Sequence, residues 1–104
     1  MSTVISPFFP AVSIDAIAGL CRRYGVRELA LFGSMAKGDA TPDSDVDLLV
    51  EFLPETKPDL YTLAEMQREL MELLRRKVDL VTKRGLKPLI RDEVLASSRV
   101  LYAE

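Results

Sequence analysis

The chain has 104 residues, so we expect one domain over residues 1–104 and exclude a second domain of ordinary size. Its 48% hydrophobic and 29% charged residues are typical of a globular protein and exclude a fully disordered chain. With 14 Lys and Arg against 16 Asp and Glu, the formal net charge is -2, so strong binding to nucleic acid is not predicted.

The first third of the chain predicts a flexible lead-in, a helix and a strand. Two prolines disfavour regular structure over residues 1–12. Apolar residues at helical spacing predict a helix over residues 13–24, which Gly25 ends. The short apolar run at residues 27–32 predicts a buried strand that stops at Gly33.

The rest of the chain predicts two further strands and two longer helices. A helical turn over residues 34–37 and a polar loop lead into a predicted strand at residues 45–52. The longest helical pattern follows Pro58 and is expected to cover one face of the sheet. Residues 77–82 predict a third strand, and a last helix begins near Leu86.

Each of the two longer helices has a predicted apolar stripe. In the first, the stripe consists of Leu60, Leu63, Met66, Leu70, Leu73 and Leu74. In the last helix, which is expected to close the domain over residues 86–104, it consists of Leu89, Ile90, Val94 and Leu95. This order of elements predicts an α/β (α+β) domain, with a small mixed sheet of three or four strands packed by helices. The pattern leaves the order of the strands open.

The inventory of side chains narrows the possible chemistry. The chain has no His, which excludes a Ser-His-Asp triad and an imidazole general base. The single Cys21 excludes an intrachain disulfide and is typical of a reducing, cytoplasmic setting. No apolar run approaches the roughly 18 residues of a membrane-spanning helix, so we expect no membrane association. Catalysis would therefore use carboxylates, hydroxyls, amines or an oxygen-bound metal.

Three carboxylates lie on two of the predicted strands. Asp45 and Asp47 are two residues apart on one strand, so their side chains leave the same face. Asp79 lies on a strand with the same alternation and can join them. Carboxylates held together repel one another unless a cation bridges them, and oxygen ligands favour Mg²⁺ or Mn²⁺. The residues therefore predict a site for a pair of divalent ions, an arrangement that supports displacement at phosphorus.

A candidate phosphate-binding turn precedes these carboxylates. Gly33 and Ser34 follow the first predicted strand, where a missing side chain lets the backbone approach a ligand and amide groups can bind phosphate. Lys37, one helical turn later, adds a positive charge suited to a triphosphate. An Asp-x-Asp or a strand-end glycine alone is more often an ordinary turn, so the prediction depends on their combination.

The spacing of these motifs resembles a known family. Residues 33–38, followed by residues 44–48, are similar to the Gly-Ser, ten residues, Asp-x-Asp signature of the DNA polymerase beta superfamily of nucleotidyltransferases. The resemblance extends through Asp79 and covers roughly residues 25–82. The short length resembles the minimal nucleotidyltransferase (MNT) branch, commonly encoded beside HEPN-domain toxins. The family usually has Arg where this chain has Lys37, which keeps the charge but loses bidentate phosphate binding.

The resemblance implies a polymerase beta-like nucleotidyltransferase fold and a role for each matching residue. Gly33 and Ser34 would bind the β- and γ-phosphates of a nucleoside triphosphate. Asp45 and Asp47 would hold the metal ions, and Asp79 would complete one metal site and help to deprotonate the attacking hydroxyl.

The resemblance also implies a function. The chain would transfer AMP from Mg-ATP to a hydroxyl of a partner protein, as the antitoxin of a HEPN/MNT toxin-antitoxin pair in a hetero-oligomer. One alternative is a noncatalytic antitoxin that neutralises its partner by occlusion. Another is transfer to a small molecule or nucleic acid with the help of a second subunit. Four apolar residues near the ends would give a partner surface to bury: Phe8, Phe9, Leu101 and Tyr102.

Overall fold

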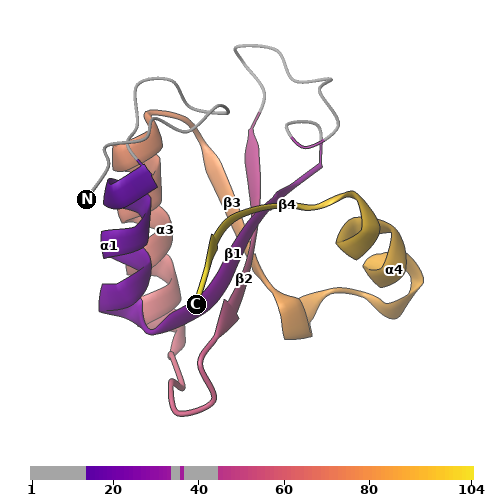
Figure 1. Cartoon of the computed structure of the whole chain (residues 1–104), viewed down its shortest axis with the longest axis horizontal. Helices are drawn as coiled ribbons and strands as arrows, with labels where there is room; N and C mark the ends of the chain where they lie inside the picture. Colours follow the sequence, from indigo (N-terminus) through magenta and orange to yellow (C-terminus); the bar gives the residue numbers. More distant parts are fainter. Residues whose placement is uncertain (1–13, 34–35, 37–44) are drawn as a thin grey trace.

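The computed structural model describes residues 14–33, 36 and 45–104. The elements in chain order are α1 (Ile14–Tyr24), β1 (Val26–Phe32), β2 (Val46–Phe52), α3 (Leu60–Leu74), β3 (Val78–Thr82), the 3-10 helix η1 (Lys83–Gly85), α4 (Pro88–Ser97) and β4 (Arg99–Ala103). Helices α1 and α3 lie side by side on one side of the sheet, and α4 lies on the other (Figure 1). This is the α+β architecture that the sequence predicts. The predicted lead-in over residues 1–12 lies outside the described residues.

The sheet has the strand order β3-β2-β1-β4. Strand β1 pairs antiparallel with both β2 and β4, whereas β2 and β3 pair in parallel. The three strands expected from the sequence are confirmed, each within one residue of its predicted bounds. The sheet is mixed, as expected, and this parallel pair places the candidate carboxylates.

Strand β4 corrects the prediction of a closing helix over residues 86–104. Helix α4 ends at Ser97, and the chain then runs antiparallel beside β1, with Tyr102 opposite Leu29. The run Val-Leu-Tyr has high strand propensity, and pairing with the free edge of β1 satisfies backbone groups that a helix end would leave open. Leu101 and Tyr102, two of the residues expected to form a partner surface, instead pack partly buried against the main core.

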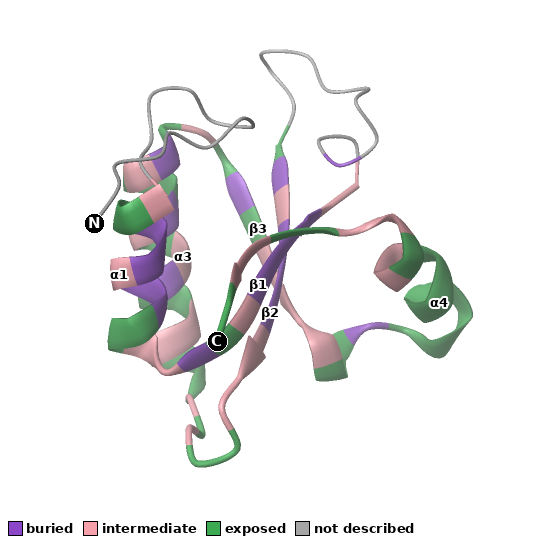
Figure 2. Ribbon diagram, viewed as in Figure 1, coloured by how far each residue is buried: buried purple, intermediate pink, exposed green. Residues whose placement is uncertain are grey.

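The hydrophobic core lies mainly between the sheet and the helix pair α1 and α3 (Figure 2). Alternate residues of β1 and β2, such as Leu29 and Leu48, point into it and are fully buried. Helix α3 contributes Met66 and Leu70, also fully buried. A smaller cluster on the opposite face consists of Ala30, Leu49 and Leu86, with Phe32, Val81, Val94 and Leu95 packed against it. Both faces of the sheet are therefore partly covered.

The predicted apolar stripes are only partly buried. In α3, Leu60 is 82% exposed because it lies in the first turn, whereas the sheet covers the later turns of the helix. In α4, Val94 and Leu95 contact the smaller cluster, whereas Leu89 is 98% exposed and Ile90 is also exposed. None of the described helices is long and apolar enough to cross a membrane.

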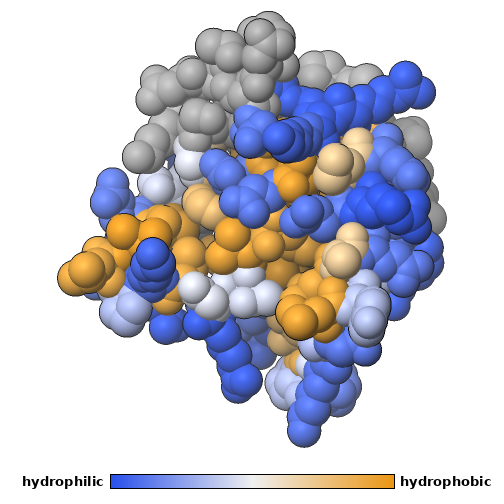
Figure 3. Space-filling view, turned by 180° about the vertical axis from the view of Figure 1, so that it is seen from behind, coloured by the Kyte–Doolittle hydropathy of each residue, from blue (hydrophilic) through white to orange (hydrophobic). Residues whose placement is uncertain are grey.

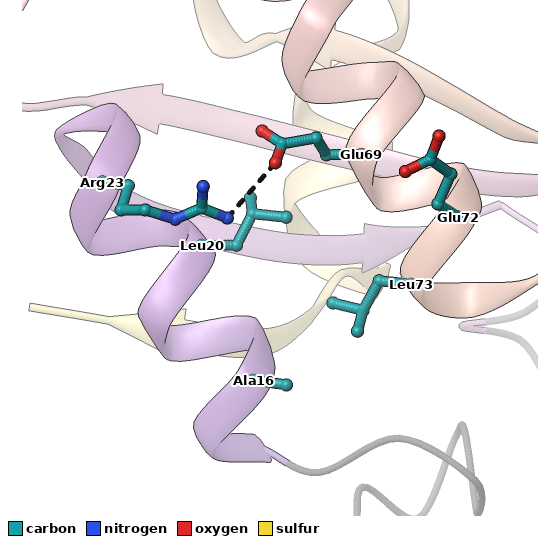
Figure 4. A pocket seen from close by; sticks show the side chains of 6 residues that line it. All are labelled: Ala16, Leu20, Arg23, Glu69, Glu72 and Leu73. Atoms are coloured by element: carbon teal, nitrogen blue, oxygen red, sulfur yellow. Dashed lines mark hydrogen bonds and ion pairs between the residues drawn. The ribbon is translucent and has the colours of Figure 1, made fainter.

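A polar contact joins α1 to α3. The hydroxyl of Tyr24 donates a hydrogen bond to the Glu69 carboxylate, and the Arg23 guanidinium lies 3.3 Å from the other oxygen of that carboxylate. Figure 4 shows the Arg23–Glu69 ion pair across a surface groove between the two helices. Glu69 thus links two consecutive residues at the end of α1 to the middle of α3.

We expect this contact to make stability depend on pH at both extremes. The hydrogen bond from Tyr24 lowers the pKa of Glu69, so its stabilisation is present above the ordinary value of 4.5 and is lost as the pH falls through the folded-state pKa. Burial, aided by the same hydrogen bond, raises the pKa of Tyr24 from 10.0 to about 12, so stability is lost as the pH rises between these values. Tyr24→Phe should weaken both dependences. Urea unfolding of both proteins across this range checks the prediction, and superimposable pH profiles would contradict it.

The start of α3 gives a second prediction about stability. Asp59 is the N-cap, and its carboxylate accepts hydrogen bonds from the backbone N–H and the hydroxyl of Thr62, each at 2.8 Å. Replacing an N-cap Asp with Ala removes these two hydrogen bonds, so Asp59→Ala should lower the free energy of unfolding and the urea midpoint. Asp92→Ala, at an exposed position within α4, is the matched control and should not destabilise the protein. Equal urea midpoints for the two variants would contradict a stabilising role of the Asp59 N-cap.

Candidate active site

The parallel pairing of β2 with β3 places two of the predicted carboxylates next to each other. Asp47 and Asp79 are opposite one another in the register, between the pairs Val46 with Val78 and Leu48 with Leu80. Adjacent strands lie about 4.8 Å apart, and directly paired residues project from the same face. The structure therefore brings Asp79 beside Asp47, an arrangement that the sequence pattern could only suggest.

The burial pattern shows which face carries these carboxylates. Val46 and Val78, the residues before them, are buried in the main core under α1 and α3. Asp47 and Asp79 therefore project to the opposite face, which α4 partly covers. Asp47 is half-buried and Asp79 is exposed, so a ligand could reach the pair from solvent. Asp45 is exposed directly before β2.

The electrostatic environment of Asp47 is unfavourable to its charge. Burial raises the pKa of the Asp47 carboxyl, and the nearby charges of Asp79 and Asp45 raise it further. Asp79, which is distant in sequence, and Asp45 on the same segment thus both act on the Asp47 carboxyl. A cation bound between them would remove this repulsion, and a donor set of carboxylate oxygens fits Mg²⁺ or Mn²⁺.

Gly33 brings the backbone against the same carboxylate. It directly follows Phe32, which is opposite Asp47 in the antiparallel register of β1 with β2. Its φ of +72° lies in the left-handed region, which favours glycine. A Cβ at this position would overlap Oδ2 of Asp47. The absence of a side chain therefore lets the end of β1 pass directly beside the carboxylate.

The remaining predicted site residues are Ser34 and Lys37. Both lie outside the described residues, so their phosphate-binding roles stay predictions. Within the described part of the chain, no group of three or more His, Cys, Asp or Glu side chains is arranged to hold a metal ion. Metal binding by Asp45, Asp47 and Asp79 is therefore a prediction that the paired carboxylates and the raised pKa of Asp47 support.

Gln67 contacts the strand that carries Asp79, a contact that sequence reasoning missed. Its side-chain oxygen accepts a hydrogen bond from the backbone N–H of Leu80, at 3.1 Å, on the outer edge of β3. This contact ties α3 to the strand that carries Asp79, one residue away. The only signal in the sequence is a neutral amide within a helix otherwise rich in charge on its polar side, and such a residue is common on helix surfaces.

Comparison with known families decides the class of protein. The family model for the nucleotidyltransferase domain matches residues 15–101, which is most of the chain. The match includes β2 and β3, the two strands that carry the candidate carboxylates. The chain belongs to the nucleotidyltransferase domain family. The predicted resemblance is thus confirmed, and this nucleotidyltransferase is a member of an enzyme family.

Individual relatives are consistent with this assignment. The protein adenylyltransferase MntA of Thermococcus cleftensis is 47% identical over 76 residues, which cover 73% of this chain and 75% of MntA. A crystal structure of a toxin-antitoxin with AMP-PNP has a chain with a TM-score of 0.72 and 25% identity, covering 88% of this nucleotidyltransferase and 73% of that chain.

A third relative shares the fold at lower sequence identity. It is a chain from a Shewanella oneidensis structure of a tri-AMPylated HEPN toxin in complex with an MNT antitoxin. The TM-score is 0.64 at 22% identity, covering 88% of this nucleotidyltransferase and 70% of that chain. At this identity the likeness shows a common fold.

Proposed function

We propose that this nucleotidyltransferase transfers AMP from ATP to a hydroxyl group of a partner protein, as the antitoxin of a HEPN/MNT pair. The observation that carries the proposal is the pairing of Asp47 with Asp79 against the backbone of Gly33. The relative MntA, named a protein adenylyltransferase, supports the reaction. The fold shared with a toxin-antitoxin that holds AMP-PNP supports the nucleotide and the kind of partner.

The reaction forms one bond and breaks one. The acceptor oxygen bonds to the α-phosphorus of ATP, the bond from that phosphorus to the oxygen of the β-phosphate breaks, and pyrophosphate leaves. The hydroxyl proton must go to a base. Asp79 is exposed beside Asp47 and carries a carboxylate, so we assign it this task.

The protein contributes mainly position and charge. When bound, Mg²⁺ supplies positive charge that neutralises the triphosphate, and Asp45, Asp47 and Asp79 would hold it. Asp47 is anchored on a strand in the middle of the sheet, so its carboxylate is fixed before ATP arrives. Gly33 lets the backbone at the end of β1 lie directly against that carboxylate, and its amide with Ser34 and Lys37 would supply the phosphate contacts.

The surface around the site supports the proposal that the acceptor is a protein. Leu89 and Ile90 of α4 and Val100 of β4 are exposed large apolar residues on or beside the sheet face that carries Asp47. Figure 3 shows apolar surface mixed with polar residues on the side of the molecule opposite to the view of Figure 1. Exposed apolar residues of this kind are typical of surfaces that a partner covers.

Transfer of label from ATP to the partner tests the proposal. The chain, the product of the neighbouring gene and ATP labelled at the α-phosphate should give labelled partner in the presence of magnesium. Asp47→Asn should remove the label, whereas Asp92→Asn, an exposed carboxylate on α4, should leave it unchanged. A partner that stays unlabelled with the native chain, or is labelled equally by Asp47→Asn, would overturn the proposal.

The same variants separate catalysis from occlusion. If the chain only covers its partner, a folded Asp47→Asn/Asp79→Asn variant should still neutralise the toxin in growing cells. We expect this variant to lose neutralisation while it still binds the partner. Full neutralisation by the double variant would favour the noncatalytic antitoxin.

A further inference from the structure

A second cleft lies at the other end of the sheet from the carboxylates. It has a volume of about 810 Å³ and is lined by residues from the ends of β2 and β3, the connection from β2 to α3, and α4. Figure 1 shows the β2–α3 connection and η1 at this same end. Pockets of roughly 300–1,000 Å³ are typical for small organic ligands. Of the residues that the structure describes, none assigned to AMP transfer lines this cleft.

The cleft is strongly basic although the chain as a whole is acidic. Five of the 14 Lys and Arg residues line it, against a single carboxylate, Glu51. The five are Arg27, Lys57, Lys83, Arg84 and Arg91. They come from sequence positions 27–91 and converge only in the folded chain. Like charges gathered in this way repel one another, and a bound anion would relieve the repulsion.

Most of these cations are not neutralised by the protein itself. Lys83 lies 3.5 Å from Glu51. Among the residues that the structure describes, the other four cations of the cleft form no ion pair. The cleft therefore presents several unpaired positive charges, whose donors are free to bind a ligand.

The cleft is separate from the carboxylate site. Glu51 lies four residues beyond Asp47 on β2, and Thr82 lies three residues beyond Asp79 on β3. At about 3.3 Å per residue, the two sites are about 10–13 Å apart along the strands. Asp47 and Asp79 lie near the starts of β2 and β3, so an anion in the cleft would lie near the other ends of these strands.

We propose that this cleft binds a small organic phosphate. Arg27, Arg84 and Arg91 carry guanidinium groups, whose planar donors match phosphate oxygens in pairs. The cleft also has an apolar wall that includes Phe52 and Leu63, which would contact the organic part of the ligand. Inorganic phosphate alone would leave this wall without a contact. A ligand with both a phosphate group and an organic part therefore fits the cleft better.

The test uses a background in which the carboxylate site is disabled. In the Asp47→Asn/Asp79→Asn chain, with EDTA present, ADP is titrated calorimetrically and inorganic tripolyphosphate serves as a second probe. We expect saturable binding of one ADP per chain. Arg84→Gln/Arg91→Gln should weaken ADP binding about tenfold or more, because it removes two charge-assisted contacts. Arg22→Gln/Arg99→Gln changes the net charge equally at exposed positions outside the cleft and should leave the affinity unchanged.

Each outcome decides the proposal. Saturable ADP binding that depends on Arg84 and Arg91, and is stronger than that of tripolyphosphate, supports an organic phosphate. No saturable binding, or an equal loss in both double variants, would overturn the site. Much tighter binding of a single-stranded oligonucleotide than of ADP, with several chains per strand, would show a nucleic-acid surface instead. Because the background lacks the paired carboxylates, failure here leaves the proposed AMP transfer unaffected.

Discussion

Asp47→Asn is expected to abolish AMP transfer and, at the same time, to stabilise the free protein. The activity should fall about 10³-fold, the size of loss seen when one preorganised charge is removed from a transition state. Stability should rise because burial and the charges of Asp79 and Asp45 disfavour ionised Asp47, and an amide of the same shape carries no charge. We therefore expect the variant to melt at a higher temperature than the native chain.

Labelled ATP and thermal unfolding of the same preparations measure both effects. Asp92→Asn is the control for a general effect of removing a negative charge, and it should change neither quantity appreciably. The combination of lower activity with higher stability is specific to strained functional sites. A variant that loses both activity and stability would show that Asp47 has a structural role, and the argument from its raised pKa would be wrong.

Gly33→Ala is the second substitution with a large expected effect. At φ +72° an alanine is strained, and its Cβ would overlap Oδ2 of Asp47, so the carboxylate or the end of β1 must move. A displacement of about 1 Å in a catalytic group costs on the order of 10²-fold in rate. We expect a loss of this size in label transfer, together with a loss of about 1–2 kcal/mol in unfolding free energy from backbone strain.

Gly19→Ala provides the matched control for a methyl group added to a glycine. Gly19 lies within α1, and a Cβ there meets no described atom within 4 Å. Alanine is favoured over glycine in a helix by about 0.5–1 kcal/mol, so this variant should be more stable and equally active. If Gly33→Ala behaves like Gly19→Ala in both measurements, Gly33 has no part in shaping the site.

Much of the fold follows from local patterns. The alternation around Asp47 and the apolar run before Gly33 predict β2 and β1, because side chains of a half-buried strand have a period of two. The period of 3.6 after Pro58 likewise predicts the long helix α3. Strand β4 was missed because its run of three apolar residues follows directly on a helical pattern, and only pairing with the distant β1 makes it a strand.

The site itself required information that is not local. The sequence places Asp45 and Asp47 on one face, but the approach of Asp79 depends on the parallel register of β2 with β3. The contact between Gly33 and the Asp47 carboxylate likewise depends on the antiparallel register of β1 with β2. Registers are set by the packing of both faces of the whole sheet, which no single segment encodes.

The basic cleft could not be predicted at all from the sequence. Arg84 and Arg91 look like the solvated side of a helix start, and Arg27 is a polar residue at a strand end. Only the fold brings these positions around one volume. Isolated cations in a sequence with a net charge of -2 give no indication of where they gather.

Calorimetric titration with a nonhydrolysable ATP analogue, with and without magnesium, is the most direct test of the paired carboxylates. We predict saturable binding by the native chain that requires magnesium and weakens about 100-fold or more in Asp47→Asn/Asp79→Asn, since loss of two ligand carboxylates removes the charge that holds the cation. In Asp92→Asn the affinity should equal that of the native chain. Binding that is equally tight without magnesium, or in the chain that lacks both carboxylates, would contradict a nucleotide site built on Asp47 and Asp79.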